Sequence, residues 1–472
     1  MKRKKGSITL FSSIALLLVS AALFALLEGT RLQEMRRFAL LQTESALESA
    51  FGNYHTYLWE RYRVLGADGS SMQKIVERSA GGRMGNGTNL LRLVPEDVQL
   101  EEYTRLTDGG GTVYIANVAS YMKENFVYEM AKEVYSQYES IKQILNMSQM
   151  DTSNITSALE KMEKSDSAKQ TRTRDKSVDV KEILENAKHW MDVGILHLVM
   201  ENTDEISDME LEYGNGVLDR KLLEGKNPVE YTNSWTERIL LQQYLLTYLS
   251  GYMDKNENGA LSYELEYLVG KKSSDIENLK IVVTKLLSIR EASNFLYLIS
   301  DSISMAEAEA MAILLVGATA NPVLIETVKI GLVTAWALGE SILDVRAILA
   351  GKKISLLKSE ESWTLELENL GVLSNTDRMA KESSWGLGYE EYLGILLLLE
   401  KEQNLAMYAM NLQEAAIRKN TGDSQFCIDT LITHAKGRVK YSYNPVFPFL
   451  SVINAEERWE YAVWASAEYG YE

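Results

Sequence analysis

One stretch of the chain, residues 254 to 265, has the spacing of a calcium-binding loop. It reads DKNENGALSYEL and follows the first half of an EF-hand, with helical patterns on both sides. Gly259, at the sixth position, would make the sharp turn that such a loop needs. The oxygen donors at positions one, three, five, seven and nine would be Asp254, Asn256, Asn258, the carbonyl of Ala260 and, through a water, Ser262.

The second half of this loop lacks its closing ligand. The twelfth position, where a bidentate glutamate completes an EF-hand, is Leu265. Glu264 and Glu266 flank it, but a shift of one residue along a helix turns a side chain by about 100°. Asp254 would then be the one charged ligand, so calcium would bind weakly. The alternative is a plain turn that uses Asp, Asn and Gly for its backbone shape.

The rest of the sequence offers no metal or catalytic pattern. The four histidines, His55, His189, His197 and His434, are scattered, and neither His-Glu-x-x-His nor Cys-x-x-Cys occurs. A Gly-x-Ser-x-Gly nucleophile elbow is also missing from the sequence. We therefore expect no catalytic residue, no cofactor other than the calcium alternative, and no enzyme.

The N-terminus has the pattern of a membrane signal-anchor. Basic residues at positions 2–5 precede an uncharged run from Ile8 to Leu27, which at helical rise spans a bilayer core of about 30 Å. The positive-inside bias predicts a cytoplasmic segment at 1–7, a transmembrane helix at 8–27 and an exported body. The alternative is a cleaved signal peptide with its cleavage site at Ser20-Ala21-Ala22.

The elements that follow the anchor are mostly helical. Apolar residues recur at helical spacing beyond Glu28, so the anchor should continue as a stalk helix over 28–66. We expect a fold that is mainly α with minor β, in which the transmembrane and stalk helix precedes a mostly helical exported body. The further divisions are an α+β segment at 67–148, a linker or mobile excursion at 149–178 and a mostly helical exported domain at 179–472.

The most apolar part of the body, residues 305–350, could be mistaken for a second membrane span. Asn321-Pro322 interrupts it, and Glu340 closes the next apolar segment after a few turns. We therefore expect a buried antiparallel helix pair joined by a turn at Asn321-Pro322. Strands are expected at 91–106 and 438–443.

Composition restricts the partners of this chain. The formal net charge is −17, and subtracting the four positive charges at positions 2–5 gives −21 for residues 6–472. That sign excludes nucleic-acid binding through a basic surface and disfavours adsorption to anionic lipid. The single cysteine, Cys427, cannot form an intramolecular disulfide, and we expect its thiol to be buried.

Several segments resemble a known family. They include KKGSITLF and LLEGTRLQ around the apolar run, ANPVLIETVKIGLVTAWALGESILDVRAILAGKKISLLK, and GLGYEEYLGILLLLE. The chain resembles an uncharacterised Gram-positive domain-of-unknown-function family encoded beside Tad/Flp pilus genes, and its anchor is similar to that of TadE/TadG-like proteins. The segments between 263 and 400 are the more specific part of this resemblance.

The resemblance implies a place, a Tad-type pilus or secretion apparatus, and no reaction. Tad prepilins carry a glutamate at the fifth mature position, whereas the fifth residue after Gly6 is Phe11, so a retained anchor is expected. The expected function is that of a non-enzymatic pilus accessory or pilin-like protein, which would contact membrane lipid and Tad components through its transmembrane and stalk helix. The alternative is a membrane-anchored extracellular binding module of the adhesin or sensor type.

Overall fold

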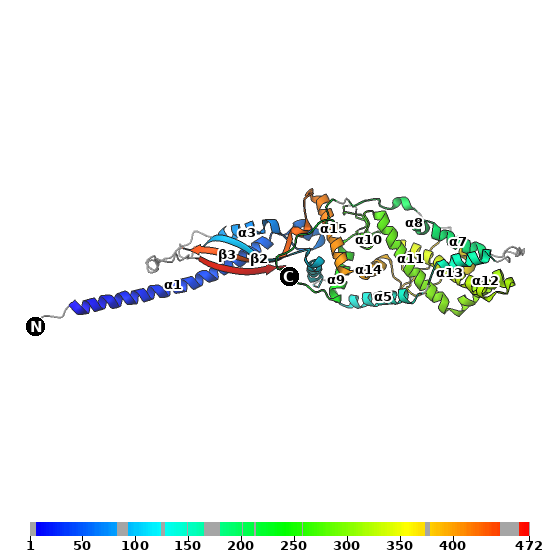
Figure 1. Cartoon of the computed structure of the whole chain (residues 1–472), viewed down its shortest axis with the longest axis horizontal. Coiled ribbons are helices and arrows are strands. Elements are labelled where there is room, and N and C mark those ends of the chain that lie inside the picture. The colour runs from blue at the N-terminus through cyan, green and yellow to red at the C-terminus, as the bar shows by residue number, and fades with distance from the viewer. Residues whose placement is uncertain are drawn as a thin grey trace. The chain divides into compact units, whose positions relative to one another are not determined.

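The computed structural model of the chain describes residues 6–82, 93–123, 128–148, 150–164, 180–200, 202–211, 214–256, 258–372, 378–443 and 462–471. The chain folds into two compact units (Figure 1). The first, called the anchor unit below, comprises Met1–Tyr121, Asp219–Asn233 and Gln425–Glu472. The second, the helical unit, comprises Met122–Leu218 and Ser234–Ser424.

The anchor unit begins with one long helix, α1 (Gly6–Phe51), of 46 residues, which is about 70 Å long at the rise of an α-helix. Its first part exposes large apolar side chains, and none of its most apolar window is buried. Its last part turns one face into the protein core. The buried residues of that face recur at helical spacing and include Met35, Ala39, Thr43, Ala46, Leu47 and Ala50.

Helix α1 ends at Phe51, earlier than the stalk helix expected over 28–66. The chain turns there because the amide of His55 donates to the carbonyl of Gly66 at 3.0 Å and Tyr54 pairs with Ala67. A second, short helix, α2 (Thr56–Tyr62), lies between these paired positions. The expected stalk is therefore one continuous helix only as far as the end of α1.

A small antiparallel sheet packs against the buried face of α1 (Figure 1). Its strands are β1 (Ala67–Asp68), β2 (Leu93–Arg105), β3 (Leu431–Tyr443) and β4 (Ala462–Gly470). Strand β3 is central, with β2 on one edge and β1 and β4 on the other. Helix α3 (Gly69–Gly82) covers the same core as α1. The strands expected at 91–106 and 438–443 are thus confirmed.

The remaining elements of the anchor unit lie around the sheet. Two short 3-10 turns, η2 (Asp108–Gly110) and η7 (Ile428–Thr430), precede α4 (Thr112–Lys123) and β3 respectively. Cys427, next to η7, is partly and not fully buried, so the expectation of a buried thiol is wrong. The segment Asp219–Asn233, called the strap below, is extended chain without a helix or strand of its own.

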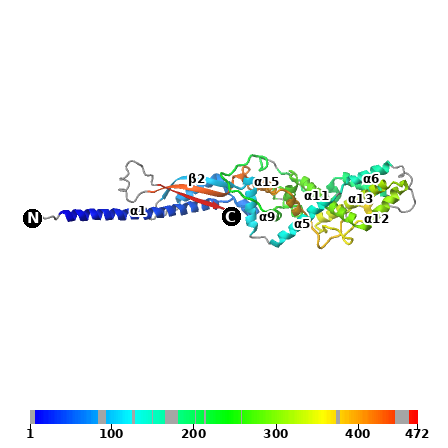
Figure 2. The ribbon, with the colours of Figure 1, turned by 60° about the horizontal axis from the view of Figure 1, so that its bottom comes forward.

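The helical unit is built around α13 (Pro322–Leu349), most of which is buried. Figure 2 shows α6 (Ser153–Glu163), α13 and α12 (Ser302–Val316) side by side, and α11 (Asp275–Ser300) packs on α13 as well. The other helices are α5 (Tyr128–Met147), α7 (Val180–Asp192), α8 (Ile195–Val199), α9 (Trp235–Tyr248), α10 (Glu264–Gly270), α14 (Tyr389–Leu399) and α15 (Glu402–Thr421). The expected fold class, mainly α with minor β, is confirmed.

Helix α6 occupies part of the span expected as a linker or mobile excursion, 149–178. Its apolar residues Ile155, Ala158 and Met162 are buried. Gly331 of α13 permits the contact, since a Cβ there would lie 2.6 Å from the Cβ of Ala158. This part of the span is therefore packed, and residues 165–179 lie outside the described ranges.

The helix pair expected over 305–350 is present as α12 and α13, joined by a turn that ends at Asn321. The Asn321 side chain accepts hydrogen bonds from the amides of Val323 and Leu324, and Pro322 is the first helical residue. By length and composition alone α1, α13 and the span Ser302–Thr319, which contains α12, could each cross a membrane. The most apolar window of α13 is 61% buried within the protein and that of α12 is 22% buried.

Candidate functional site

The five candidate calcium ligands lie in a loop between α9 and α10. Asp254 is exposed, and its amide donates to the carbonyl of Gly251. Asn256 accepts a hydrogen bond from the amide of Asn258 at 2.9 Å, so these two residues form an Asx turn. Ala260, whose backbone carbonyl is the fourth candidate ligand, is 6% exposed.

The last candidate ligand, Ser262, takes its partners from another segment. Its hydroxyl oxygen accepts from Ser207 at 3.2 Å and lies 3.2 Å from the sulfur of Met209. Helix α15 also contacts the loop, where Lys419 Nζ donates to the carbonyl of Gly259 at 2.8 Å and Asn420 donates to a neighbouring carbonyl at 3.0 Å. The loop is thus fastened by side chains of the protein, and whether it is a calcium site or a plain turn stays open to experiment. Within the described ranges, no group of three or more His, Cys, Asp or Glu side chains could hold a metal ion.

Beneath this loop lie three buried carboxylates that the sequence pattern did not single out as a group. Glu264, Glu266 and Asp275 each have 0% exposure. Glu266 accepts from the hydroxyl of Tyr389 at 2.6 Å and from the amide of Tyr252 at 2.9 Å. Burial raises the pKa of Glu266 to about 7, against the opposing effect of these hydrogen bonds.

The other two carboxylates hold backbone groups. Glu264 accepts from both the amide and the hydroxyl of Ser250 at 3.1 Å. Asp275 accepts from the amides of Ser262 and Tyr263 at 3.0 and 3.1 Å. Each of the three carboxylates accepts a hydrogen bond from a backbone amide of a neighbouring loop. Together they hold the chain in place where α10 and α11 begin. The Glu-x-Glu pattern at the start of α10 was the available sequence signal.

A second buried cluster crosses α11 and α13. The carboxylate of Asp344 contacts Arg290 Nη2 at 2.9 Å and Lys358 Nζ at 2.7 Å. Lys358 also contacts Glu340 at 2.6 Å, and all four side chains have 0% exposure. Asn294 donates to Asp344 at 2.8 Å. Two cationic and two anionic side chains thus lie together in the core. Burial alone would lower the pKa of Arg290, but the neighbouring carboxylate of Asp344 raises it above its ordinary value.

This cluster explains how α13 buries Glu340, the charged residue that closes the apolar segment in the sequence. Helix α13 continues through Glu340 to Leu349 because Lys358 neutralises the carboxylate and the amides of Thr364 and Leu365 bind it. Near the start of the same helix, Glu326 and Lys329 form an ion pair of 2.6 Å.

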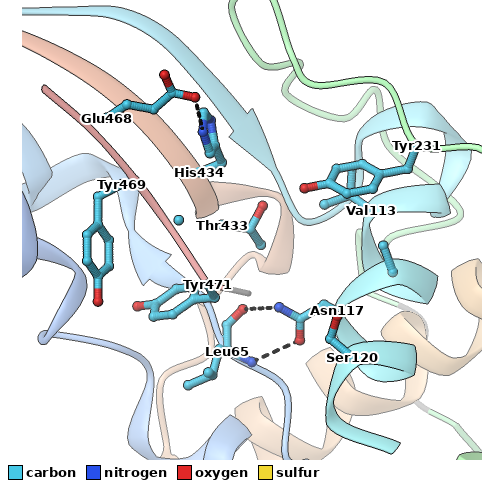
Figure 3. A pocket seen from close by; sticks show the side chains of 12 residues that line it. Leu65, Val113, Asn117, Ser120, Tyr231, Thr433, His434, Glu468, Tyr469 and Tyr471 are labelled. Carbon is cyan, nitrogen blue, oxygen red and sulfur yellow. Dashed lines mark hydrogen bonds and ion pairs between the residues drawn. The ribbon is translucent and has the colours of Figure 1, made fainter. Parts of the chain in front are cut away.

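The anchor unit contains a pocket of about 810 Å³ beside one end of β3 and β4 (Figure 3). A volume of this size lies within the usual range for small-molecule sites, roughly 300–1,000 Å³. Its lining residues are Leu65, Val113, Ala116, Asn117, Ser120, Tyr231, Thr433, His434, Glu468, Tyr469, Gly470 and Tyr471.

One wall of the pocket is a face of α4. Val113, Asn117 and Ser120 share this face through their spacing of three or four residues. The side chain of Asn117 accepts from the amide of Leu65 and donates to its carbonyl, both at 3.2 Å. The α4 wall is therefore tied to the chain that follows α2.

The strap forms a second wall and carries Tyr231. Two buried carboxylates hold it against the sheet: Asp108 accepts from the amide of Gly225 at 3.0 Å, and Asp429 accepts from the amide of Leu223 at 2.9 Å. Asp429 also pairs with Arg220 at 2.6 Å. These bonds place the strap without any regular secondary structure of its own.

The third wall comes from β3 and β4. The imidazole Nε2 of His434 lies 2.8 Å from the carboxylate of Glu468. Gly470 pairs with His434 across the strands, and a Cβ there would lie 2.8 Å from the imidazole ring. Glycine is therefore required for the ring to lie over β4. Figure 3 shows His434 and Ser120 on opposite sides of the pocket, so they do not form a nucleophile and base pair.

Sequence reasoning missed this pocket because its residues come from five separate segments of the chain. His434 was noted only as one of four scattered histidines, and spacing along the chain carried no signal for Tyr231 or Glu468. His55 and His197 take part in helix ends, where His55 accepts a hydrogen bond from the amide of Leu58 at the start of α2 and His197 lies in the last turn of α8.

Residues 173–443 match the model of a family described as "Family of unknown function (DUF5702)". The matched span is more than half of the chain and includes α7 to α15, the strap and β3. No match was found among curated proteins or among solved structures. On the strength of this span, the chain belongs to the family of unknown function DUF5702.

Proposed function

We propose that this protein is a non-enzymatic, membrane-anchored accessory or pilin-like component of a Tad-type pilus or secretion apparatus. One observation carries the proposal: α1 is a single helix whose first part is apolar and uncovered and whose last part lies in the core of the anchor unit. A force or contact on the membrane half of such a helix is transmitted directly to the folded body. A flexible tether would not provide this coupling.

The first part of α1 supports membrane insertion. Ile8, Leu17 and Leu26 are each more than half exposed although they are apolar, which is costly in water and favourable in lipid. Basic residues precede the run, so the body would lie on the outer side of the membrane. Small residues such as Ala15, Ser20 and Ala22 would let partner helices approach closely.

The last part of α1 supports a rigid junction. Leu47 and Phe51 are buried with strands that come from the C-terminal end of the chain. The centroid of the Phe51 ring lies 5.1 Å from the ring centroid of Tyr469 and 5.2 Å from that of Tyr471. The helix and the sheet therefore share one core, as a subunit that assembles through its anchor helix requires.

Co-purification from membranes tests the assembly. The wild-type chain, crosslinked in the membrane and solubilised, should capture Tad-type pilin or platform components. Ala22→Leu, which enlarges a small residue of the apolar run, should reduce capture, whereas the control Leu17→Ile should not. Wild-type chain that is isolated alone after crosslinking would refute the proposal.

The single cysteine tests the topology. Cys427 is only partly buried in the anchor unit, so a membrane-impermeant maleimide should label it in intact cells if the body is exported. A Ser7→Cys variant in a Cys427→Ser background should be labelled only after the membrane is opened. Labelling of Ser7→Cys in intact cells together with protection of Cys427 would reverse the proposed orientation.

The second candidate is a membrane-anchored extracellular binding module. The observation that favours it is the pocket beside β3 and β4, which no assembly through α1 requires. The two roles are compatible in one chain, because the pocket and the apolar run of α1 are built from different residues.

A further inference from the structure

The pocket of the anchor unit has the chemistry of a ligand site and lacks fixed positive charge. None of its lining residues is Lys or Arg. Its one carboxylate, Glu468, has one oxygen 2.8 Å from His434 Nε2, and its side chain is 61% exposed at the rim. Phosphates, nucleotides and carboxylates need cationic or clustered amide donors, so the lining disfavours an anionic ligand.

The hydroxyl groups of Tyr231 and Ser120 are available to a ligand in this pocket. Tyr231 extends from the strap with its hydroxyl toward the centre of the pocket, and Ser120 lies on the α4 wall (Figure 3). Neither hydroxyl has a hydrogen-bond partner among the described residues. Each can both donate and accept, which matches a ligand that itself carries hydroxyl groups.

Aromatic and aliphatic surface surrounds these hydroxyls. The ring of Tyr471 is fixed, because its hydroxyl donates to the carbonyl of Phe51 at 2.5 Å and the two rings meet edge to face. Val113 and Leu65 add aliphatic surface. A ligand would therefore meet a preorganised aromatic face together with separate hydrogen-bonding groups, which lowers the entropy lost on binding.

We propose that this pocket binds a neutral saccharide. A sugar ring has an apolar C–H face, which can pack on Tyr471 or Tyr231, and hydroxyl groups at its edge, which can bond to Tyr231 and Ser120. The volume of about 810 Å³ is sufficient for more than one sugar ring. The inference goes beyond the assembly role, since it holds whether or not α1 recruits pilus components.

The position of Tyr231 makes the pocket dependent on the strap. The amide of Val229, two residues away, donates to the hydroxyl of the buried Thr104 at 2.8 Å. Lys226 forms two backbone hydrogen bonds with Tyr103, of 2.9 and 3.0 Å. Tyr231 is therefore the residue whose substitution should change the pocket most without disturbing the sheet.

The test measures binding to the full chain held in lipid nanodiscs, which avoids sugar-based detergents. Saturation-transfer NMR and calorimetry would use cellotriose and maltotriose as probes, with choline and glucose 6-phosphate as competing ligand classes. We expect at least one trisaccharide to bind and the other two classes not to bind. Absence of trisaccharide binding up to millimolar concentration, or preferential binding of choline or of the phosphorylated sugar, would overturn the proposal.

Substitutions of Tyr231 test whether the trisaccharide binds in this pocket. Tyr231→Phe removes one hydroxyl and should weaken binding by about three- to tenfold, the usual net value of one neutral hydrogen bond. Tyr231→Ala should weaken it further. Trp385→Ala, which removes a 94% exposed aromatic ring from the helical unit, serves as the control and should have no effect. Equal affinity of the wild type and Tyr231→Ala would contradict the assignment, and thermal melts of Tyr231→Phe verify folding.

Discussion

The hydroxyl of Tyr441 lies 3.2 Å from Oγ1 of Thr43, and both side chains have 0% exposure. Thr43 already donates its one hydroxyl proton to the carbonyl of Ala39 at 2.8 Å, so Tyr441 is the donor to Thr43. This bond joins the anchor helix to a strand 398 positions later. The fold of the anchor unit therefore depends on contact between helix α1 and the much later strand β3.

The Thr43–Tyr441 bond should contribute to stability in a way that a double-variant cycle can measure. Thr43→Val leaves the buried Tyr441 hydroxyl without an acceptor, and this should cost about 1–3 kcal/mol in the free energy of unfolding. Thr43→Val combined with Tyr441→Phe removes both groups and should recover part of that loss. Chemical denaturation of the four proteins gives the coupling energy. Strictly additive effects would show that the bond contributes nothing.

The buried charge cluster predicts a larger effect in the helical unit. Asp344→Asn leaves Arg290 and Lys358 with only one carboxylate between them, and this should destabilise the protein by about 3–5 kcal/mol. Lys358→Gln in the same chain restores neutrality and should recover part of the loss. Thermal unfolding measures both.

An exposed ion pair provides the control for that cluster. Glu185 contacts Lys181 at 3.0 Å on α7, with side chains 52% and 38% exposed. Glu185→Ala should change stability by less than about 1 kcal/mol, because solvent screens an exposed pair. Equal losses for Glu185→Ala and Asp344→Asn would contradict a special role for burial.

The sequence predicted those features that depend on local pattern. The anchor helix followed from a charge-free run next to basic residues, and the α12–α13 turn followed from Asn321-Pro322. Both signals act within a few residues of the structure that they specify. The end of α1 at Phe51 was missed because it depends on pairing between His55 and Gly66.

The sequence could not predict features that depend on distant contacts. Arg105 pairs with Ile432, and no local pattern links two strands so far apart. The burial of Glu340 within α13 depends on Lys358, which belongs to another segment. The pocket was unpredictable for the same reason, since Tyr231 is placed by backbone bonds of an extended strap.

Calcium should not stabilise the loop at 254–262. The ammonium of Lys419 lies 2.8 Å from the carbonyl of Gly259, so a positive charge is already bound where a calcium loop turns. Thermal melts with calcium and with chelator should coincide for the wild type and for Asp254→Ala. A calcium-dependent rise in melting temperature that Asp254→Ala abolishes would instead establish the EF-hand-like site.

Glu266 should make stability depend on pH. Burial raises its pKa to about 7, from the ordinary 4.5, so the folded protein retains a proton that the unfolded chain has lost. Folding thus takes up a proton between these values, and stability falls as pH rises from about 4.5 to about 7. The shift corresponds to roughly 3 kcal/mol at most.

Glu266→Gln tests this dependence, because its side-chain oxygen can still accept from Tyr389 and Tyr252 while the titration is lost. The stability of this variant relative to wild type should increase as pH rises from about 5 to about 8. The control is Glu390→Gln, an exposed residue of α14, which should run parallel to wild type. The measurement is the free energy of unfolding of the wild type and both variants at several pH values. Parallel curves for Glu266→Gln and wild type would mean that the buried carboxylate is ionised in the folded protein throughout this range.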